Sequence, residues 1–314
     1  MKKYKICKIL LVILAIFLCM AFYELLGICV AYKKQPEVSN TTKKETKNGS
    51  WNECSENTER AVIIEKNPEA LLQRVRLIKN AKKEIILSTF AFQSDESGKL
   101  ILGALHDAAD RGVHIRLLVD GMESWIDMEG NPYFYGLSSH ENVEIKLYNK
   151  ANPLKPWKMM GRMHDKYLIA DGKRYILGGR NTYNYFLGDF PGHKNYDRDV
   201  LVVCDEPEKE NSVNQLLEYF ETIWEQEDSG YFHDNKKLAN RKSVKNAVLE
   251  LQNSYQKYFE ENKERICDTD YTDETFETEK IALVSNPIHT GSKEPVVWYQ
   301  LGELMKNAKN RVKI

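Results

Sequence analysis

The chain has 314 residues, of which 42% are hydrophobic and 29% are charged, which suffices for one large globular domain or two small ones. Its formal net charge of −1 gives no overall attraction for a polyanion, so phosphate recognition has to be local and nucleic acid is not expected as a partner. The six cysteines have neither the spacing of a zinc site nor the pattern of a disulfide framework, so no metal site is predicted.

Residues 1–32 are predicted to be a single-pass membrane anchor. Four lysines among the first eight residues precede an apolar run, Ile9–Tyr32, that only Glu24 interrupts, and about 20 apolar residues suffice to cross a bilayer. A cleaved signal peptide is the alternative, but the run continues past Glu24 and no small-x-small cleavage site follows it. The leading lysines favour a cytoplasmic N-terminus and an extracytoplasmic main domain, although two lysines after the run weaken that orientation.

Strand and helix patterns alternate after a polar stretch, residues 33–60, that is predicted to be a flexible linker. Strands are expected at residues 61–65, 84–92, 113–120, 143–148 and 198–203, and helices at residues 68–82, 98–111, 207–225 and 241–263. Near-continuous apolar strands separated by helices indicate an α/β fold, with a mixed sheet flanked by helices on both faces.

The segment that starts at His164 is predicted to be a β-hairpin that carries the chemistry. Residues 164–171 have the pattern of a strand, Asp171-Gly172 that of a tight turn, and residues 174–177 that of a returning strand. Because side chains alternate along a strand, His164 and Lys166 are expected to project from one face. An imidazole can attack phosphorus while an ammonium neutralises the non-bridging oxygens, so the pair suits phosphodiester transfer.

Residues beyond the first strand extend the expected site. Gly178 and Gly179 remove side-chain bulk, which lets Asn181 offer its amide to the same phosphate, and Asp171 is expected to hold the hairpin through bonds to the backbone. One histidine on a strand is usually structural, and Asp-Gly is an ordinary hairpin turn. The added Gly-Gly-x-Asn at the correct distance makes the functional interpretation the better one.

This order of residues resembles the HKD motif of the phospholipase D superfamily. The pattern H-x-K-x4-D-x6-G-[GS]-x-N is matched by His164, Lys166, Asp171, Gly178, Gly179 and Asn181. The surrounding sequence, RMHDK…GGRN…YDRDVLVV, is similar to that of bacterial cardiolipin synthases. The resemblance implies catalysis without metal or cofactor, in which one histidine becomes a phosphohistidine and another handles the proton. It makes His164 the nucleophile or its acid/base counterpart, and it assigns phosphate binding to Lys166, Gly179 and Asn181.

The resemblance also implies an acidic residue downstream that orients the nucleophilic histidine. Asp199 is the candidate, and Asp197 is the second choice because it points to the opposite face of the expected strand. Such a carboxylate fixes the tautomer of the imidazole, as the aspartate of a catalytic triad does.

The end of the chain echoes its beginning, because Lys-Asn-Ala-Lys occurs at residues 79–82 and again at residues 306–309. Each copy follows a short apolar strand, at residues 61–65 and 281–285, and a helix. Residues 61–275 are therefore predicted to be a first phospholipase D-like domain with a helical connector, and residues 276–314 the truncated start of a second. No second His-x-Lys occurs in the sequence, so the other motif is expected from a longer gene product or from a homodimer partner.

The predicted function is that of a membrane-anchored phosphatidyltransferase of the cardiolipin synthase type, acting on a phospholipid such as phosphatidylglycerol. The apolar segment at residues 153–160, with its tryptophan, is suited to lie against acyl chains. Two alternatives stay open. One is a dimeric phospholipase D or nuclease that uses water as the acceptor, and the other is a non-catalytic membrane-tethered fragment, because half of a two-histidine site lacks its general acid or base.

Overall fold

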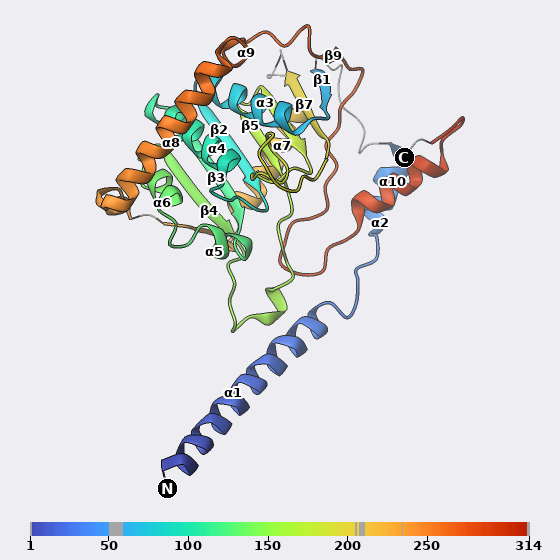
Figure 1. Cartoon of the computed structure of the whole chain (residues 1–314). Coiled ribbons are helices and arrows are strands. Elements are labelled where there is room, and N and C mark those ends of the chain that lie inside the picture. The colour runs from blue at the N-terminus through green and yellow to red at the C-terminus, as the bar shows by residue number, and fades with distance from the viewer. Residues whose placement is uncertain (1, 50–58, 205, 207–210, 234, 313–314) are drawn as a thin grey trace. The chain divides into compact units, whose positions relative to one another are not determined.

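The computed structural model describes residues 2–49, 59–204, 206, 211–233 and 235–312, which divide into two compact units (Figure 1). The larger unit lies within Trp51–Lys150 and Met163–Leu283 and holds the sheet. The smaller unit lies within Met1–Ser50, Ala151–Arg162 and Val284–Ile314.

The described part of the larger unit forms one nine-stranded sheet in the order β8-β4-β3-β2-β5-β6-β7-β1-β9. Its strands are β1 (Glu59–Ile64), β2 (Glu84–Thr89), β3 (His114–Asp120), β4 (Val143–Tyr148), β5 (Tyr167–Ala170), β6 (Arg174–Gly178), β7 (Asp199–Cys204), β8 (Ser229–Tyr231) and β9 (Phe276–Glu277). Strands β2, β3 and β4 are parallel, and the other neighbouring pairs are antiparallel. The carboxyl ends of the three parallel strands therefore meet at one edge of the sheet.

Helices cover both faces of this sheet, as the sequence predicts. They are α3 (Asn67–Asn80), α4 (Glu96–Asp110), α5 (Glu123–Asp127), α6 (Pro132–Ser138), α7 (Ser212–Trp224), η3 (Lys236–Asn240), α8 (Lys242–Glu261) and α9 (Lys263–Cys267). Alternate residues of β3, such as Ile115 and Leu117, join the core cluster that holds the apolar faces of α3 and α4. Tyr167 points to the other face, where its ring lies edge-on to Phe220 of α7 at 6.5 Å between centroids. The predicted mixed α/β sheet is confirmed.

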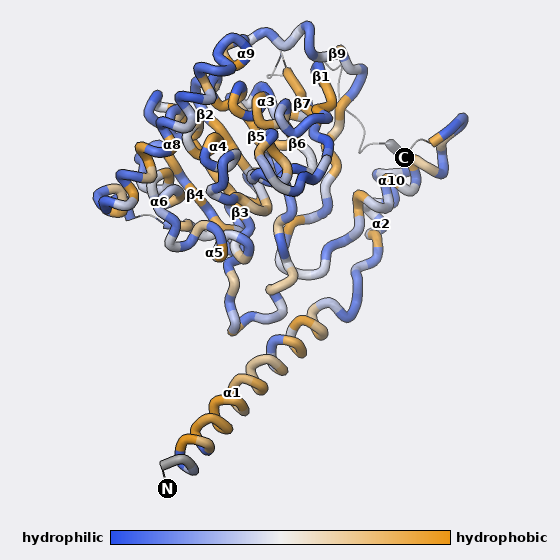
Figure 2. The backbone as a smooth tube through the Cα atoms, viewed as in Figure 1, coloured by the Kyte–Doolittle hydropathy of each residue, from blue (hydrophilic) through white to orange (hydrophobic). Residues whose placement is uncertain are grey.

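The smaller unit begins with helix α1 (Lys2–Ala31), within which Tyr4–Ala31 is long and apolar enough to cross a membrane and is not buried. Figure 2 shows this helix as an almost continuous hydrophobic stretch. Close to its C-terminal end it contacts the short helix η2 (Pro156–Lys158), and the Tyr23 hydroxyl donates to the Leu154 carbonyl at 3.1 Å. Helix α1 and the apolar 153–160 segment thus belong to one unit.

Residues 40–48, predicted to be part of a flexible linker, instead form helix α2 (Asn40–Asn48). The composition is polar, but the ends are well capped. Ser39 Oγ accepts from Thr42 N–H, and Gly49 takes the left-handed conformation at φ 75°. Ser39 N–H also donates to the Glu294 carboxylate at 2.8 Å, so the helix has a tertiary partner. Residues 59 and 60, also assigned to the linker, already belong to β1, and residues 50–58 lie outside the described residues.

The predicted second repeat is matched in part. Its helix is present as α10 (Val296–Lys306), but residues 281–285, predicted to be a strand, pair with no strand in the described chain. Strand residues need a neighbour for their backbone groups, and here Leu283 N–H donates instead to Gln215 Oε1 at 2.8 Å. Apolar alternation alone does not supply that neighbour.

Candidate active site

His164 lies three residues before β5, at the edge where the parallel strands end. The fully buried Asp120 at the end of β3 fixes this position, because its Oδ2 accepts the N–H of Met163 at 3.0 Å. Its Oδ1 accepts the N–H groups of Met122 and Glu123 at 3.1 and 3.2 Å. One carboxylate therefore ties the end of β3 to the backbone that presents the histidine. Asp120 is 44 positions upstream of His164, and no pattern in the sequence links the two.

The His164 side chain is exposed on one side and rests on Phe90 on the other. The two ring centroids are 4.7 Å apart and the planes are tilted by 58°. Partial burial, and then the charge of Lys166, hold the pKa of His164 below its ordinary value. The neutral imidazole, which carries the nucleophilic lone pair, is thereby favoured at neutral pH.

Lys166 is nearly buried beside the same aromatic ring, with 5% of its surface exposed. Its Nζ donates to the carbonyl of His164 at 2.7 Å and lies 5.4 Å from the Phe90 ring centre. Burial lowers the pKa of Lys166 to about 8, against the opposing charges of Asp165 and Asp197. The ammonium sits within reach of the histidine and holds few competing partners, so it is placed to bind an anionic oxygen.

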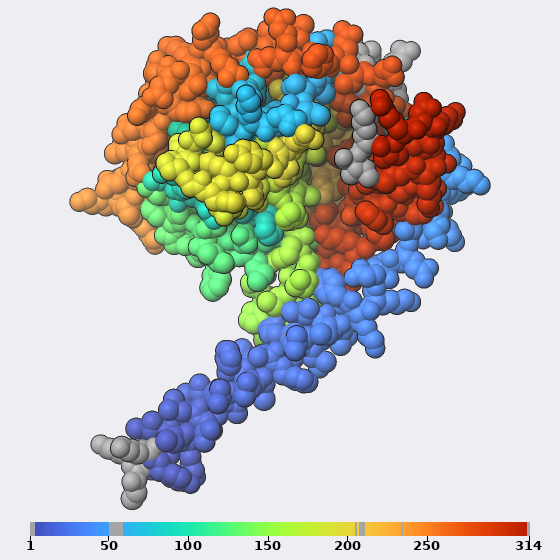
Figure 3. Space-filling model, turned by 45° about the vertical axis from the view of Figure 1, so that its right-hand side comes forward, coloured from blue at the N-terminus to red at the C-terminus, as the bar shows by residue number. Residues whose placement is uncertain are grey.

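Asn181 follows β6 and is held against the end of β2. Its Oδ1 accepts the N–H of Ala91 at 3.2 Å, and no hydrogen bond within the described residues engages its Nδ2. The amide donor therefore stays available next to Phe90. Figure 3 shows the segment after Asn181, drawn in yellow, on the surface between the light-blue β1–α3 region and the green α5–α6 region. Bonds from Asn184 to Asp95 and from Gly188 to Asn67 hold it there.

The two glycines of the motif are required by the next strand. A Cβ at Gly178 would overlap Asp199 Oδ1, and a Cβ at Gly179 would overlap the Asp197 carboxylate. From the sequence, these glycines were expected to remove side-chain bulk so that Asn181 could reach the phosphate. In the structure they make room for two carboxylates at the start of β7, one of which acts electrostatically on Lys166.

Asp171 lies at the far end of β5, away from His164, in a left-handed conformation at φ 55°. Its carboxylate accepts three backbone N–H groups, from Lys82 at 2.8 Å, Lys83 at 2.7 Å and Glu84 at 3.0 Å. The expected bonds to the backbone are therefore present, but they fasten the hairpin to the start of β2 rather than closing its own turn. The structure does not bring Asp171 together with His164, Lys166 and Asn181.

Asp199, predicted to orient the histidine, is engaged elsewhere. It is 2% exposed, and its Oδ2 is bonded to Arg74 at 2.9 Å and to Arg180 at 3.2 Å. The structure shows no hydrogen bond between Asp199 and His164. Both guanidinium groups are buried, so the carboxylate is needed to neutralise them. Neither arginine was recognisable from the sequence as its partner.

A second link supports the motif from the other face of the sheet. The Tyr219 hydroxyl of α7 donates to Asp165 Oδ2 at 2.7 Å, and burial together with Asp165 raises the pKa of this phenol far above its ordinary value. The residue between His164 and Lys166 is thus tied to α7. This bond fixes the backbone from which both side chains project.

The comparisons identify the family. A family model described as "Cardiolipin synthase, PLD-like domain" matches residues 74–224, which include every element of the site. This matched region belongs to the phospholipase D superfamily. It is 30% identical over 212 residues to an uncharacterized protein of Helicobacter pylori strain J99, covering 63% of this chain and 39% of that protein.

Two proteins with known names are among those that the chain resembles. Cardiolipin synthase C of Escherichia coli K12 is 29% identical over 171 residues, which are 50% of this chain and 34% of that protein. Among solved structures, the phosphatidylserine synthase of Haemophilus influenzae is similar with a TM-score of 0.48 and 15% identity, over 78% of this chain and 52% of that chain. The chain therefore spans about two fifths or less of the Helicobacter pylori protein and of cardiolipin synthase C.

Proposed function

We propose that the chain carries one half of a phosphatidyltransferase site and that His164 is its nucleophile. The observation that carries the proposal is the arrangement of three side chains around Phe90. The imidazole of His164 packs against this ring at a tilt, the nearly buried ammonium of Lys166 lies over it, and the amide oxygen of Asn181 accepts the N–H of the next residue, Ala91. Together they offer a lone pair and two kinds of donor to one phosphate.

The proposed reaction has two steps, and the first consumes a lipid phosphodiester. The lone pair of His164 attacks phosphorus, a nitrogen–phosphorus bond forms, and the bond to the leaving alcohol oxygen breaks. Lys166 and Asn181 stabilise the charge that builds on the non-bridging oxygens. The leaving oxygen takes a proton from a second acid. In the second step an acceptor alcohol gives its proton to that group and attacks the phosphohistidine, which frees His164.

The second acid has to come from a second motif, in the same polypeptide or in a partner subunit. We propose that residues 281–312 begin a second copy of the fold. Pro68, Gln73 and Leu77 recur as Pro295, Gln300 and Leu304 at the spacing of the repeated Lys-Asn-Ala-Lys.

The two corresponding helices differ in what covers them. Helix α3 buries its apolar face, including Leu71 and Ile78, against the sheet, whereas α10 exposes Trp298 to 76% and Leu304 to 52%. An uncovered apolar face is what the first helix of a second sheet-bearing domain would show in the absence of that sheet.

A phospholipid substrate is supported by the anchor and by the names of the relatives. Helix α1 offers a membrane span, and cardiolipin synthases from Escherichia coli and Staphylococcus aureus are among the proteins that the chain resembles. We propose phosphatidylglycerol as the donor and a lipid-borne hydroxyl as the acceptor. The lysines before the anchor support an extracytoplasmic site.

The test is synthesis of cardiolipin by the full-length gene product in vesicles of phosphatidylglycerol. Cardiolipin and free glycerol should form, and both should be lost on His164→Ala. They should be retained on His193→Ala, whose ring lies beside Tyr185 outside the motif. Formation of phosphatidic acid without cardiolipin would establish hydrolysis instead, and cleavage of plasmid DNA would favour a nuclease. No reaction with any phosphodiester would leave a membrane-tethered non-catalytic protein.

A further inference from the structure

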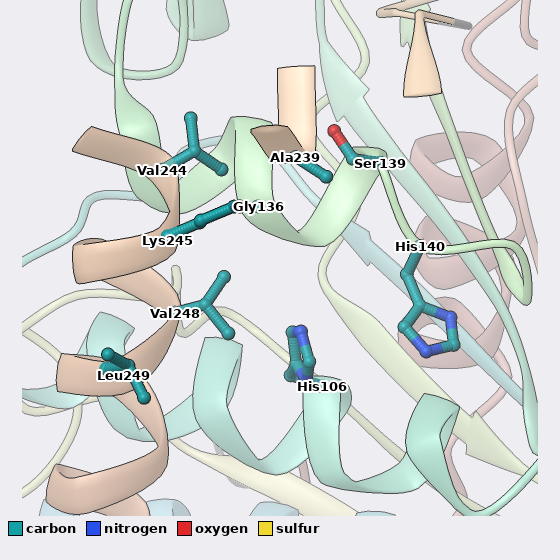
Figure 4. A pocket seen from close by; sticks show the side chains of 9 residues that line it. All are labelled: His106, Gly136, Ser139, His140, Ala239, Val244, Lys245, Val248 and Leu249. Atoms are coloured by element: carbon teal, nitrogen blue, oxygen red, sulfur yellow. The ribbon is translucent and has the colours of Figure 1, made fainter. Parts of the chain in front are cut away.

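A pocket of about 450 Å³ opens on the larger unit between helices α4, α6 and α8 (Figure 4). It lies at the opposite end of the sheet from His164. His140, which lines it, precedes the amino end of β4, and Asp110, which contacts the lining residue His106, precedes that of β3. Asp120, beside the candidate active site, instead ends β3. Seven residues of strand separate the two ends by about 20 Å. This pocket is distinct from the site described above.

The walls of the pocket are mostly apolar. Val244, Val248 and Leu249 come from α8, and Gly136 comes from α6, where a Cβ would approach Val248 to 2.6 Å. Figure 4 shows the ring of His106 standing up from its helix into the space between Val248 and His140. His106 is only 8% exposed, so a buried polar group faces an apolar chamber.

A carboxylate fixes both histidines. Asp110 lies with its Oδ2 3.0 Å from Nδ1 of His106 and its Oδ1 3.3 Å from Nε2 of His140. The N–H of Asn142 donates to Nδ1 of His140, so the proton of that ring is on Nε2. Asp110 likewise requires a donor at Nδ1 of His106. In the neutral ring the remaining nitrogen, Nε2, is then an acceptor, and no hydrogen bond in the described part of the chain engages it.

This arrangement selects ligand chemistry. A hydroxyl that donates to Nε2 of His106 completes its bonding, and an apolar body fills the space beside Val248. An anion is disfavoured, because it would face the lone pair of His106 Nε2 and the nearby Asp110 carboxylate. Lys245, which lines the pocket, lies on an exposed turn of α8. We propose that this pocket binds a neutral, largely apolar molecule with one hydroxyl group, of the phenol or short aliphatic alcohol class. The proposal is independent of the transferase activity.

The test uses the full chain in lipid nanodiscs with ¹⁵N-labelled histidine, and phenol as the probe. Nuclear magnetic resonance should show a saturable shift of the His106 Nε2 signal with phenol. Toluene, which has the same size but no donor, should bind about tenfold more weakly, because the lost hydrogen bond is worth about 1.4 kcal/mol. Benzoate should bind more weakly than phenol. Equal affinity for toluene, or tighter binding of benzoate, would overturn the proposal.

Two variants separate binding from folding. Val248→Trp puts an indole into the apolar space beside His106 and leaves Asp110 unchanged, so it should abolish the phenol-dependent shift while the His106 signal remains that of the folded chain. The matched control is His114→Phe, because His114 bonds Glu144 on the sheet and does not line the pocket. It should leave phenol binding unchanged. Retention of the shift in Val248→Trp would show that phenol binds elsewhere.

Discussion

The lowered pKa of Lys166 predicts that activity is lost at a lower alkaline pH than an ordinary lysine would give. Burial brings this pKa to about 8, and the charged form is the one that stabilises the phosphate oxygens. A lysine at its ordinary value of about 10.4 stays charged at pH 9. Lys166 of the free enzyme is then only about one tenth charged, so kcat/KM should fall about tenfold for each pH unit above 8.

The assay is the initial rate of phosphatidylglycerol turnover by the full-length gene product at constant ionic strength between pH 5 and pH 10. Activity should also fall on the acid side at a pH below the ordinary histidine value, because the pKa of His164 is lowered. Lys166→Arg keeps its charge throughout, so the limb near pH 8 should vanish even though the misfitting guanidinium lowers the plateau. An alkaline limb near pH 10 in the wild type would refute the role given to burial.

Three further substitutions test the structural claims by urea unfolding of the full chain. Lys166→Met should abolish turnover but stabilise the fold near neutral pH by up to about 3 kcal/mol, because a buried charge is removed, and lack of any gain would contradict its burial. Asp199→Asn should lower the free energy of unfolding by about 3–5 kcal/mol, because it leaves Arg74 and Arg180 without a counter-charge. A much smaller loss of stability would argue against that network. Gly178→Ala should lower the free energy of unfolding by about 1–3 kcal/mol, because the added methyl group overlaps Asp199. Unchanged stability would show that β7 moves to make room for it.

The hairpin was predictable from sequence because its information is local. His164, Lys166 and Asn181 are close along the chain, and they flank two neighbouring strands, β5 and β6, that one turn joins. The same reasoning extended the first strand too far: β5 starts only at Tyr167, because the backbone before it bonds to Asp120 instead of following the strand.

The supporting residues were not predictable in this way, because their partners are set by tertiary pairing. Phe90 and Asp120 reach the site only because β2 and β3 are parallel neighbours that end together. The alternation of side chains along a strand favoured Asp199 over Asp197 as the partner of His164. That alternation gives no information about the buried Arg74, which forms an ion pair with Asp199. The linker was misjudged for another reason, since a polar composition conceals a helix whose stability comes from its caps and from Glu294.

The most direct test of the central claim is to trap the covalent intermediate. The full-length gene product is mixed with phosphatidylglycerol, quenched within milliseconds in alkali, where phosphohistidine survives, and digested for mass spectrometry. The account predicts a phosphatidyl adduct on His164 that His164→Ala abolishes and the matched His193→Ala preserves. An adduct on another residue, or turnover without any adduct on His164, would contradict it.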